Sequence, residues 1–411
     1  MKDMSEFMAK SVCILGRLPA LGLAELESLY GSDHLKTLEN AALLDIPAEE
    51  INFKRLGGTI KVARILAEIP STKWAELAKY LADKIPEHLK HLPEGKFTLG
   101  ISVYGLRVDV AEINRTALQI KKIIKQSGRP VRIVPNKAVA LNSAQVLHNK
   151  LTYKGAWELL YIKNGSKTLL AQTMFIQDID AYAARDQARP ARDPRVGMLP
   201  PKLAQTIINL AAGRPETRIG KRWDSGDGLG RFLVLDPFCG TGVILQEALL
   251  MGYSVYGTDI DPRMVDYTKK NLQWLVKNKP EIEGKVTIEQ ADATSYQWPG
   301  FSTIASEVFL GRSLAKFPDE MTLKQVISDA NTIIKKFLKN LAPQLKTDQV
   351  LCLAIPAWRR PGGQMVNLPV IDHLTEMGYN YWDLKHVSRE DLVYYREDQV
   401  VTRRLLRLKK A

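Results

Sequence analysis

Cysteine and histidine are scarce in this sequence of 411 residues. The three cysteines, Cys13, Cys239 and Cys352, lie far apart without the spacing of metal ligands, and the six histidines form no cluster. A disulfide scaffold is therefore excluded, structural zinc is disfavoured, and a reducing compartment fits this cysteine usage.

Long apolar runs and targeting signals are missing as well. No window approaches the ~20 consecutive apolar residues that a membrane-spanning helix requires. Residues 1–16 lack the apolar core and the cleavage site of a signal peptide. We therefore expect a cytoplasmic protein without a membrane partner.

Acidic residues are outnumbered, since 58 Lys and Arg stand against 45 Asp and Glu and the formal net charge is +13. This excess favours a polyanionic partner such as nucleic acid, although many soluble proteins are basic without one. Apolar residues make up 45% of the chain and charged residues 25%, as in globular proteins. The length indicates two or three domains.

The order of predicted elements divides the chain into parts. An apolar strand, an amphipathic helix that ends at Gly31 and a second strand form a small α+β unit. A mixture of strands and helices follows, with a hairpin that turns at Asn164-Gly165. After an Arg- and Pro-rich linker, helices alternate with apolar strands, which predicts an α/β domain. The expected boundaries are 1–70, 71–176, 177–199 for the linker, and 200–411.

The strongest local signal is a strand, a glycine turn and a helix near residue 240. The strand FLVLD ends at Asp236, and the turn PFCGTG brings Gly240 and Gly242 before the next helix. Glycine permits backbone angles closed to other residues and lets a ligand approach the backbone. In a doubly wound sheet, such a turn lies at the carboxyl ends of the strands, where ligands bind.

Two further carboxylates follow the next two predicted strands. Asp259 comes about seventeen residues after Gly242, where an acid can accept both ribose hydroxyls of a nucleoside. Asp292 follows the strand KVTIE, where it can hydrogen-bond an adenine amine. The patterns G-x-G-x-x-G and G-x-x-x-x-G-K-[ST] are absent, which disfavours a dinucleotide or a nucleoside triphosphate.

The turn D-P-F-C-G-T-G resembles the first motif of nucleic-acid amino-methyltransferases, where the acid and the glycines hold the methionine part of S-adenosylmethionine. The resemblance implies this cofactor. Cys239 inside the turn is explained better as a small buried filler than as a nucleophile. The residues expected to bind the cofactor are Asp236, Pro237, Phe238, Gly240, Thr241, Gly242, Asp259, Ile260, Asp292 and Ala293.

The whole chain resembles the THUMP-domain tRNA guanosine methylases, which methylate the exocyclic amine of the guanosine at tRNA position ten. Besides the turn, the segments LGISVYG, IKKIIKQSGRPVRIV, LNSAQVLHNKL and the closing LVYYREDQVVTRRLLRL carry the resemblance. It implies a seven-stranded, doubly wound Rossmann-like class I methyltransferase domain after an N-terminal ferredoxin-like unit and a THUMP RNA-binding domain. It also implies tRNA as the partner, and it leaves a small accessory subunit open.

The chain departs from that family at the end of the fourth predicted strand. The family has an Asp-Pro-Pro-Tyr type of motif there, which holds the target amine and stacks the base. Here the stretch IASEVFLG has Glu307 and Phe309 instead. Glu307 can still accept from an amine and Phe309 can still stack, while a shift of register would bring Ser306 or Phe309 to the key places. Alternatively, Glu307 is an ordinary strand-end carboxylate.

A basic cluster in the second segment is the candidate RNA-binding surface. Lys121, Lys122 and Lys125 lie on one predicted helix, and Arg129 and Arg132 follow it. These side chains can contact phosphates, or they can form an ordinary solvated helix face.

The sequence therefore predicts a transferase that methylates the N2 amine of a guanosine in tRNA. A DNA amino-methyltransferase is an alternative because the first motif is shared with that group. A non-catalytic RNA-binding protein is the other alternative, and the altered fourth-strand motif keeps it open.

Overall fold

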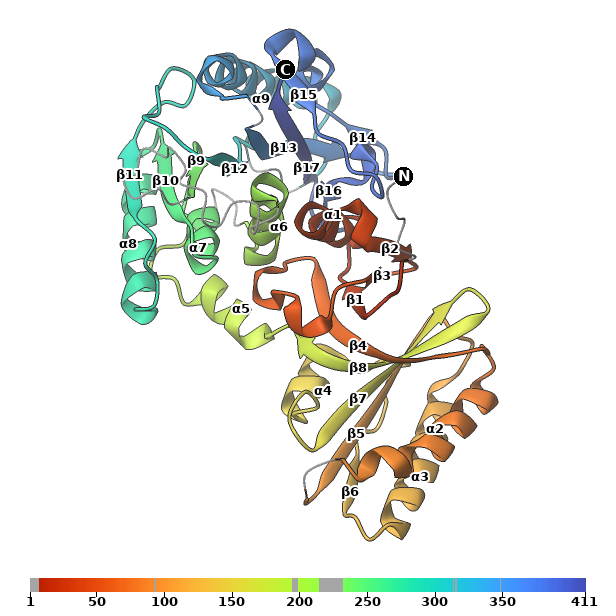
Figure 1. Ribbon diagram of the computed structural model, residues 1–411. Helices are drawn as coiled ribbons and strands as arrows, with labels where there is room; N and C mark the ends of the chain where they lie inside the picture. Colours follow the sequence, from red (N-terminus) through yellow and green to blue (C-terminus); the bar gives the residue numbers. More distant parts are fainter. Residues whose placement is uncertain are drawn as a thin grey trace, which may run out of the picture. The chain divides into compact units, whose positions relative to one another are not determined.

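A computed structural model describes residues 7–91, 94–193, 199–213, 232–312, 314, 316–347 and 349–411. The chain forms two compact units, whose helices and strands are labelled in Figure 1. The first unit comprises Met1–Pro19, Asp33–Lys54 and Thr59–Ala181, and the second comprises Ala20–Ser32, Arg55–Gly58 and Tyr182–Ala411. Within the described residues, every helix is too short or too polar to cross a membrane.

The first unit is built on one eight-stranded sheet in the order β2-β3-β1-β4-β8-β7-β5-β6. Strand β5 runs parallel to β6 and β7, and the remaining neighbours are antiparallel. The strands are β1 Ser11–Leu15, β2 Leu35–Leu38, β3 Ala41–Leu44, β4 Thr59–Ile69, β5 Phe97–Tyr104, β6 Val131–Ile133, β7 Ala156–Asn164 and β8 Lys167–Ile176.

Helices α2 (Trp74–Leu89) and α3 (Val110–Gln126) bury their apolar sides against this sheet. Helix α3 begins at a capping box, in which Asp109 accepts from the Glu112 amide and Glu112 accepts from the Asp109 amide. The short helix α4 (Ser143–His148) begins in the same way at Asn142.

The sheet runs through both expected N-terminal modules, so the compact units do not divide at residue 70. Strand β4 pairs with β1 on one side and with β8 on the other. Helix α1 (Pro19–Tyr30), except for Pro19, belongs to the second unit. There the buried Glu25 carboxylate accepts from the amides of Gly57 and Gly58 and from the Asn209 side chain. Burial nevertheless raises the pKa of Glu25.

The second unit contains a sheet whose main path has the order β11-β10-β9-β12-β13-β17-β15. The first five strands of this path, from β11 through β10, β9 and β12 to β13, run parallel to one another. Strand β17 is antiparallel to β13 and β15. The predicted seven-stranded, doubly wound sheet is confirmed, with β14 and β16 added at its side. The strands are β9 Leu233–Asp236, β10 Ser254–Asp259, β11 Val286–Gln290, β12 Thr303–Glu307, β13 Val350–Arg359, β14 Met365–Val366, β15 Tyr379–Tyr381, β16 Val393–Tyr394 and β17 Val401–Lys410.

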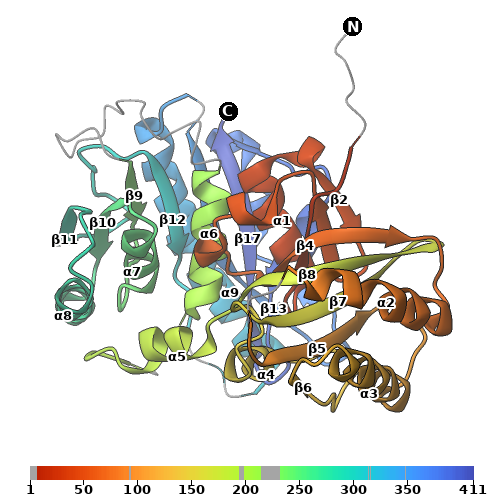
Figure 2. The ribbon, with the colours of Figure 1, turned by 60° about the horizontal axis from the view of Figure 1, so that its bottom comes forward.

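Helices cover this second sheet, and Figure 2 shows β11, β10, β9 and β12 side by side with α7 beside β9. Helix α9 buries Val326, Ile334 and Phe337 in the main apolar core. The order of strands reverses between β9 and β12, so the carboxyl ends of these two strands flank the switch point where ligands bind in such sheets. The helices are α5 Ile179–Gln187, α6 Pro201–Ala212, α7 Val243–Leu250, α8 Pro262–Asn278 and α9 Glu320–Leu341.

Candidate active site

The glycine corner (residues 236–242) joins β9 to α7. Gly240 and Gly242 have φ angles of +51° and +84°, which side-chain-bearing residues rarely adopt. A Cβ atom at Gly242 would contact Thr268 at 3.0 Å, whereas a Cβ at Gly240 would meet nothing within 4 Å. Gly242 is therefore needed for packing against α8, and the space beside the Cα atom of Gly240 is open to a ligand.

Asp259, at the end of β10, lies directly against the glycine corner. Its Oδ2 accepts from the Gly240 amide at 2.9 Å, and its Oδ1 accepts from the Asp261 amide at 3.0 Å. The Thr268 hydroxyl donates to the Gly240 carbonyl at 2.8 Å. Burial raises the pKa of the half-buried Asp259 carboxyl. The structure thus brings together the corner and the acid that the sequence spacing paired with it.

Asp236 is the most buried acid of the site, with 2% of its surface exposed. Its Oδ1 accepts from the Ser306 hydroxyl at 2.6 Å and from the Phe238 amide at 3.3 Å. Burial raises the pKa of Asp236 to about 7, and the nearby charges of Asp259 and Glu307 act in the same direction, against the two hydrogen bonds. The carboxylates of β9, β10 and β12 therefore gather at one edge of the sheet.

Asp292 lies two residues beyond β11 and is exposed. Its Oδ1 accepts from the amide and the hydroxyl of Thr294, each at 2.8 Å. The adjacent Ala291 amide donates to the Asp259 carbonyl at 3.0 Å, which places this loop beside the end of β10. Ile260 is 65% exposed at the same place, so an apolar side chain faces solvent next to the corner.

The other predicted cofactor residues are mostly part of the packing. Phe238 packs edge-on against Phe337, with 5.0 Å between ring centroids. Thr241 is buried and accepts from the Arg189 guanidinium at 3.3 Å. Pro237 accepts through its carbonyl from Thr258 at 3.3 Å, and Ala293 is 4% exposed. These residues therefore support the shape of the corner through packing and hydrogen bonds.

Cys239 is also buried in the corner, as the filler interpretation expects. The Thr268 hydroxyl lies 3.7 Å from its Sγ, and only 4% of the residue is exposed. Burial raises the pKa of this thiol well above its usual value, so the reactive thiolate is disfavoured.

The fourth-strand end (residues 306–309) has a partner that sequence reasoning missed. Arg403 of β17 donates through Nε to Glu307 Oε1 at 2.8 Å, and it donates through a terminal nitrogen to Gln399 Oε1 at 3.2 Å. The side chains of Arg403 and Glu307 are 7% and 15% exposed. The signal available in the sequence was the presence of three arginines among the apolar residues of the closing strand VTRRLLRL.

The remaining residues of the fourth-strand end point to different roles. Ser306 is fully buried with its hydroxyl on Asp236, which leaves Glu307 as the more accessible acceptor. Val308 is buried, and its amide donates to the Ala354 carbonyl at 3.1 Å. Phe309 is 40% exposed, so one aromatic side chain at this edge is available for stacking.

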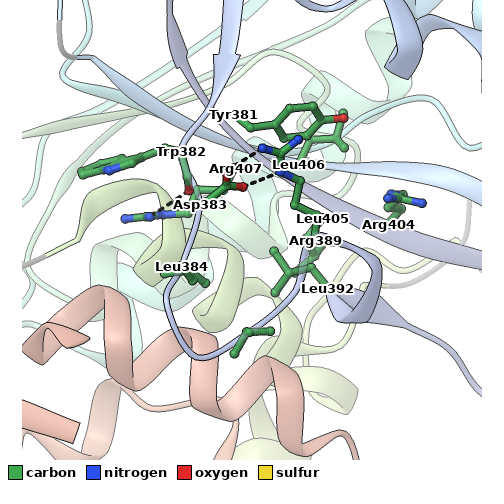
Figure 3. A pocket seen from close by; sticks show the side chains of 11 residues that line it. Tyr381, Trp382, Asp383, Leu384, Arg389, Leu392, Arg404, Leu405, Leu406 and Arg407 are labelled. Carbon is green, nitrogen blue, oxygen red and sulfur yellow. Dashed lines mark hydrogen bonds and ion pairs between the residues drawn. The ribbon is translucent and has the colours of Figure 1, made fainter. Parts of the chain in front are cut away.

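Two pockets of the second unit differ sharply. The pocket in Figure 3 has a volume of only about 10 Å³. Two arginines that line it already have partners: Arg389 forms an ion pair with Asp383, and the Arg407 guanidinium lies 3.9 Å from the centroid of the Trp382 ring. A second, open pocket of about 420 Å³ includes Gln399, the residue that contacts Arg403. Its other lining residues are Phe317, Arg359, Arg360, Pro361, Gly362, Gly363, Glu397, Asp398 and Val400.

The predicted RNA-binding cluster lies in the first unit. Lys121, Lys122 and Lys125 are on α3, and Lys122, Lys125 and Arg132 are exposed. Arg129 is more tied to the fold, because it donates to the Leu89 carbonyl at 3.1 Å and its guanidinium lies 5.9 Å from the Phe97 ring centroid.

The first unit also has a groove of about 450 Å³ between α2 and the strands β4, β7 and β8. Asp and Glu are absent from the described residues that line it. A groove that combines cations with aromatic rings suits a nucleic-acid strand. The basic and aromatic residues of its lining are Arg64, Lys84, His88, His91, Lys154, Tyr80, Tyr153 and Trp157.

The second unit and its fold are similar to those of known methyltransferases. Residues 223–340 match a family model described as the RMKL-like methyltransferase domain. The chain is 46% identical over 90 residues to a tRNA (guanine(10)-N2)-dimethyltransferase of Methanothermobacter thermautotrophicus, and 37% identical over 111 residues to one of Methanocaldococcus jannaschii. A probable enzyme of the same name from Methanothermococcus thermolithotrophicus is 28% identical over 200 residues, or 99% of its length.

The matched segments are short in the first two of these relatives: they cover 21% and 26% of this chain and 22% and 27% of the relatives. Two solved structures extend the likeness of fold over nearly the whole chain. TrmN from Thermus thermophilus has a TM-score of 0.51 at 16% identity, and a methyltransferase complexed with SAH has a TM-score of 0.50 at 12% identity. Each alignment covers 98% of this chain and 99% of the other.

Proposed function

We propose that this chain, whose residues 223–340 match the RMKL-like methyltransferase domain, methylates the N2 amine of a guanosine in tRNA with S-adenosylmethionine as the donor. The single observation that carries the proposal is the contact of Asp259 with the Gly240 amide, which sets a carboxylate beside an open stretch of backbone. The names of the relatives supply guanosine, its N2 amine and position ten.

The residues of the corner fit the methyl donor. Asp259 is placed to accept the ribose hydroxyls, because each of its oxygens keeps a lone pair beyond the backbone amide that it holds. The exposed side chain of Ile260 offers an apolar face to the adenine, and Asp292 an acceptor to its amine. The carboxylate of Asp259 beside the corner attracts a sulfonium cation.

Bound at this corner, the donor supplies a methyl group that is already activated by the sulfonium, so orientation of the acceptor is the main task of the protein. Glu307 accepts a hydrogen bond from the target amine, and Phe309 stacks on the base. A donor bound at this corner would supply its methyl group to the amine nitrogen that Glu307 orients. The proton left on that nitrogen would pass to solvent, so a strong base is not required.

RNA is the polymer that fits best, because the first unit offers two basic surfaces. One is the predicted cluster of Lys121, Lys122 and Lys125 with Arg129 and Arg132, and the other is the groove beside α2. We propose that residues 1–70 act as a ferredoxin-like module, residues 71–176 as a THUMP domain and residues 177–199 as the linker. A cytoplasmic setting agrees with the three buried free cysteines.

The two basic surfaces can be separated by substitution. We expect Lys84→Ala with Lys154→Ala to weaken tRNA binding about tenfold at low salt and to reduce the salt dependence by roughly two phosphate contacts. The triple variant of Lys121, Lys122 and Lys125 is the matched comparison. Titrations at two salt concentrations measure the tRNA affinity and its salt dependence for both sets of variants. If the variants of one surface leave these two quantities unchanged, that surface is removed from the proposal.

The function itself is tested with labelled S-adenosylmethionine and separate pools of tRNA, rRNA and DNA, followed by digestion to nucleosides. We expect label in N2-methylguanosine from tRNA only. Label in DNA alone would replace the proposal with the DNA amino-methyltransferase. Donor binding without transfer to any pool would favour the non-catalytic RNA-binding protein, for which the absent prolines of the fourth-strand end are the specific argument.

A further inference from the structure

The fourth-strand end lacks the prolines that would hold an acceptor rigidly towards a target amine. Glu307 has a longer and more flexible side chain than aspartate, and free rotation would spread its carboxylate over several positions. The backbone is held by the Val308 amide on the Ala354 carbonyl, but that contact fixes no side-chain angle of Glu307. Something else must therefore orient the carboxylate if it is to position a base.

We infer that Arg403 is the positioning residue that replaces the missing rigidity, by holding one oxygen of Glu307 and leaving the other for the target amine. This inference rests on the proposed function. The bond from Arg403 Nε to Glu307 Oε1 is 2.8 Å long and joins a buried arginine to a carboxylate that is 15% exposed. Such a charge-assisted bond is shorter and stronger than one between neutral groups.

The second oxygen of Glu307 is available for substrate. Within the described residues, Oε1 takes the bond from Arg403, and Oε2 has no hydrogen bond. A carboxylate held at one oxygen and open at the other has the form of an oriented acceptor. The positive charge of Arg403 at this end acts against the mutual repulsion of the acids gathered at this edge.

Arg403 is itself held in place by the sheet. It lies on β17 opposite Pro356 of β13, while Glu307 of β12 lies opposite Ala354 of the same strand. Gln399 accepts from its guanidinium at 3.2 Å and also lines the open pocket of about 420 Å³. The guanidinium is thus fixed from both sides, at the border between Glu307 and a pocket large enough to admit part of a nucleotide.

The test is single-turnover methyl transfer to tRNA by the full-length wild type and by Arg403→Met and Arg403→Lys. We expect Arg403→Met to lower the rate of transfer about 10- to 100-fold, because a small misplacement of the acceptor has an effect of this size. Arg403→Lys should recover at least part of the loss, since lysine retains the charge without the planar fork. The affinities for S-adenosylmethionine and tRNA should stay within about threefold.

A matched control and a second variant separate positioning from folding. Arg404→Met removes the neighbouring arginine, which points to the opposite face of β17 and lies 3.9 Å from Glu390, and it should leave the rate unchanged. Glu307→Asp, whose shorter side chain falls short of Arg403, should lower the rate to about the level of Arg403→Met.

Three results would overturn the inference: transfer by Arg403→Met within twofold of the wild type, no gain of Arg403→Lys over Arg403→Met, or a loss confined to donor affinity. A wild type that binds the donor and transfers to no RNA would instead overturn the proposed function. The two failures are thereby distinguished.

Discussion

The glycine corner and the fourth-strand end flank the same edge of the sheet, yet they are held by different means. The corner is held mainly by backbone: two glycines with positive φ, and a carboxylate that accepts from backbone amides. The fourth-strand end is held by side chains, since Glu307 depends on an arginine 96 residues later in the chain. The first arrangement is local in sequence, and the second exists only after the sheet has formed.

This difference indicates how each region tolerates change. A corner made of backbone needs particular residue types at a particular spacing, so it stays recognisable as a motif. An end held by an ion pair can keep the same geometry with other residues, provided that the partner strand supplies the cation. The absence of an Asp-Pro-Pro-Tyr type of motif at residues 307–310 is therefore compatible with an active acceptor.

The largest effect should come from the corner. Asp259→Ala removes the acceptor for the ribose and also frees the Gly240 amide, so we expect the affinity for S-adenosylmethionine to fall at least about 100-fold. Isothermal titration calorimetry measures it. Asp261→Ala is the matched control, because Asp261 is two residues away and pairs with the exposed Arg263, and it should change the affinity little. Equal affinity of Asp259→Ala and the wild type would remove the corner from the site.

The fourth-strand end should affect transfer rather than donor binding. Phe309→Ala removes the exposed ring, and we expect kcat/KM for tRNA to fall about tenfold, as stacking of a base on an aromatic ring is worth roughly 1–3 kcal/mol. Phe309→Tyr keeps the ring and should retain most of the activity. Donor affinity should be unchanged in both. An Ala variant as active as the wild type would show that the ring is not a stacking platform, and it would leave Glu307 alone at this end.

Much of the second unit could be predicted from sequence, because its signals are local. The strand ends at Asp236 and Asp259 and the turn between them follow from apolar runs and glycines, whereas the seven-stranded path was implied by the resemblance to the methylase family. Arg403 could not be paired with Glu307 in that way, since neither residue carries a mark of the other. The packing of α1 in the second unit could not be predicted for the same reason, because the hydrogen-bonded residues Glu25 and Asn209 are 184 positions apart in the sequence.

The first unit was predicted less completely. Helix α2 is absent from the predicted elements, although its buried residues Trp74, Leu77, Leu81 and Ile85 recur every three or four positions. The proline inside it, Pro86, makes that stretch look unlike a helix. Without α2, the groove that it lines was out of reach, and the basic cluster of residues 121–132 was the RNA-binding surface predicted for this unit.

Asp236 joins the two regions, because this corner residue accepts from Ser306 of the fourth-strand end. Its folded-state pKa of about 7 exceeds its ordinary value of 3.8, so between these pH values the folded protein holds a proton that the unfolded chain has released. The free energy of unfolding should therefore fall as the pH rises through this window. We expect Asp236→Asn to lessen this fall by about 1–4 kcal/mol between pH 4 and pH 8.

Urea denaturation of Asp236→Asn and the wild type at both pH values measures this effect. Asp329→Asn on α9 is a suitable control, since that acid is exposed and accepts a hydrogen bond from the exposed Gln325. Parallel pH profiles for the wild type and Asp236→Asn would mean that folding does not raise the pKa of Asp236.

The smallest effect should come from Cys239, and it decides whether the corner binds or reacts. The thiol is buried, with the Thr268 hydroxyl 3.7 Å from its Sγ, so Cys239→Ala should leave the rate of methyl transfer within about threefold and lower the stability by about 1 kcal/mol. Steady-state transfer and thermal melting measure these two quantities. A nucleophile would instead lose several orders of magnitude in rate. Such a loss would show that the glycine corner contains a reacting group and does more than bind the donor. The orientation of an amine by Glu307 would then no longer account for the reaction.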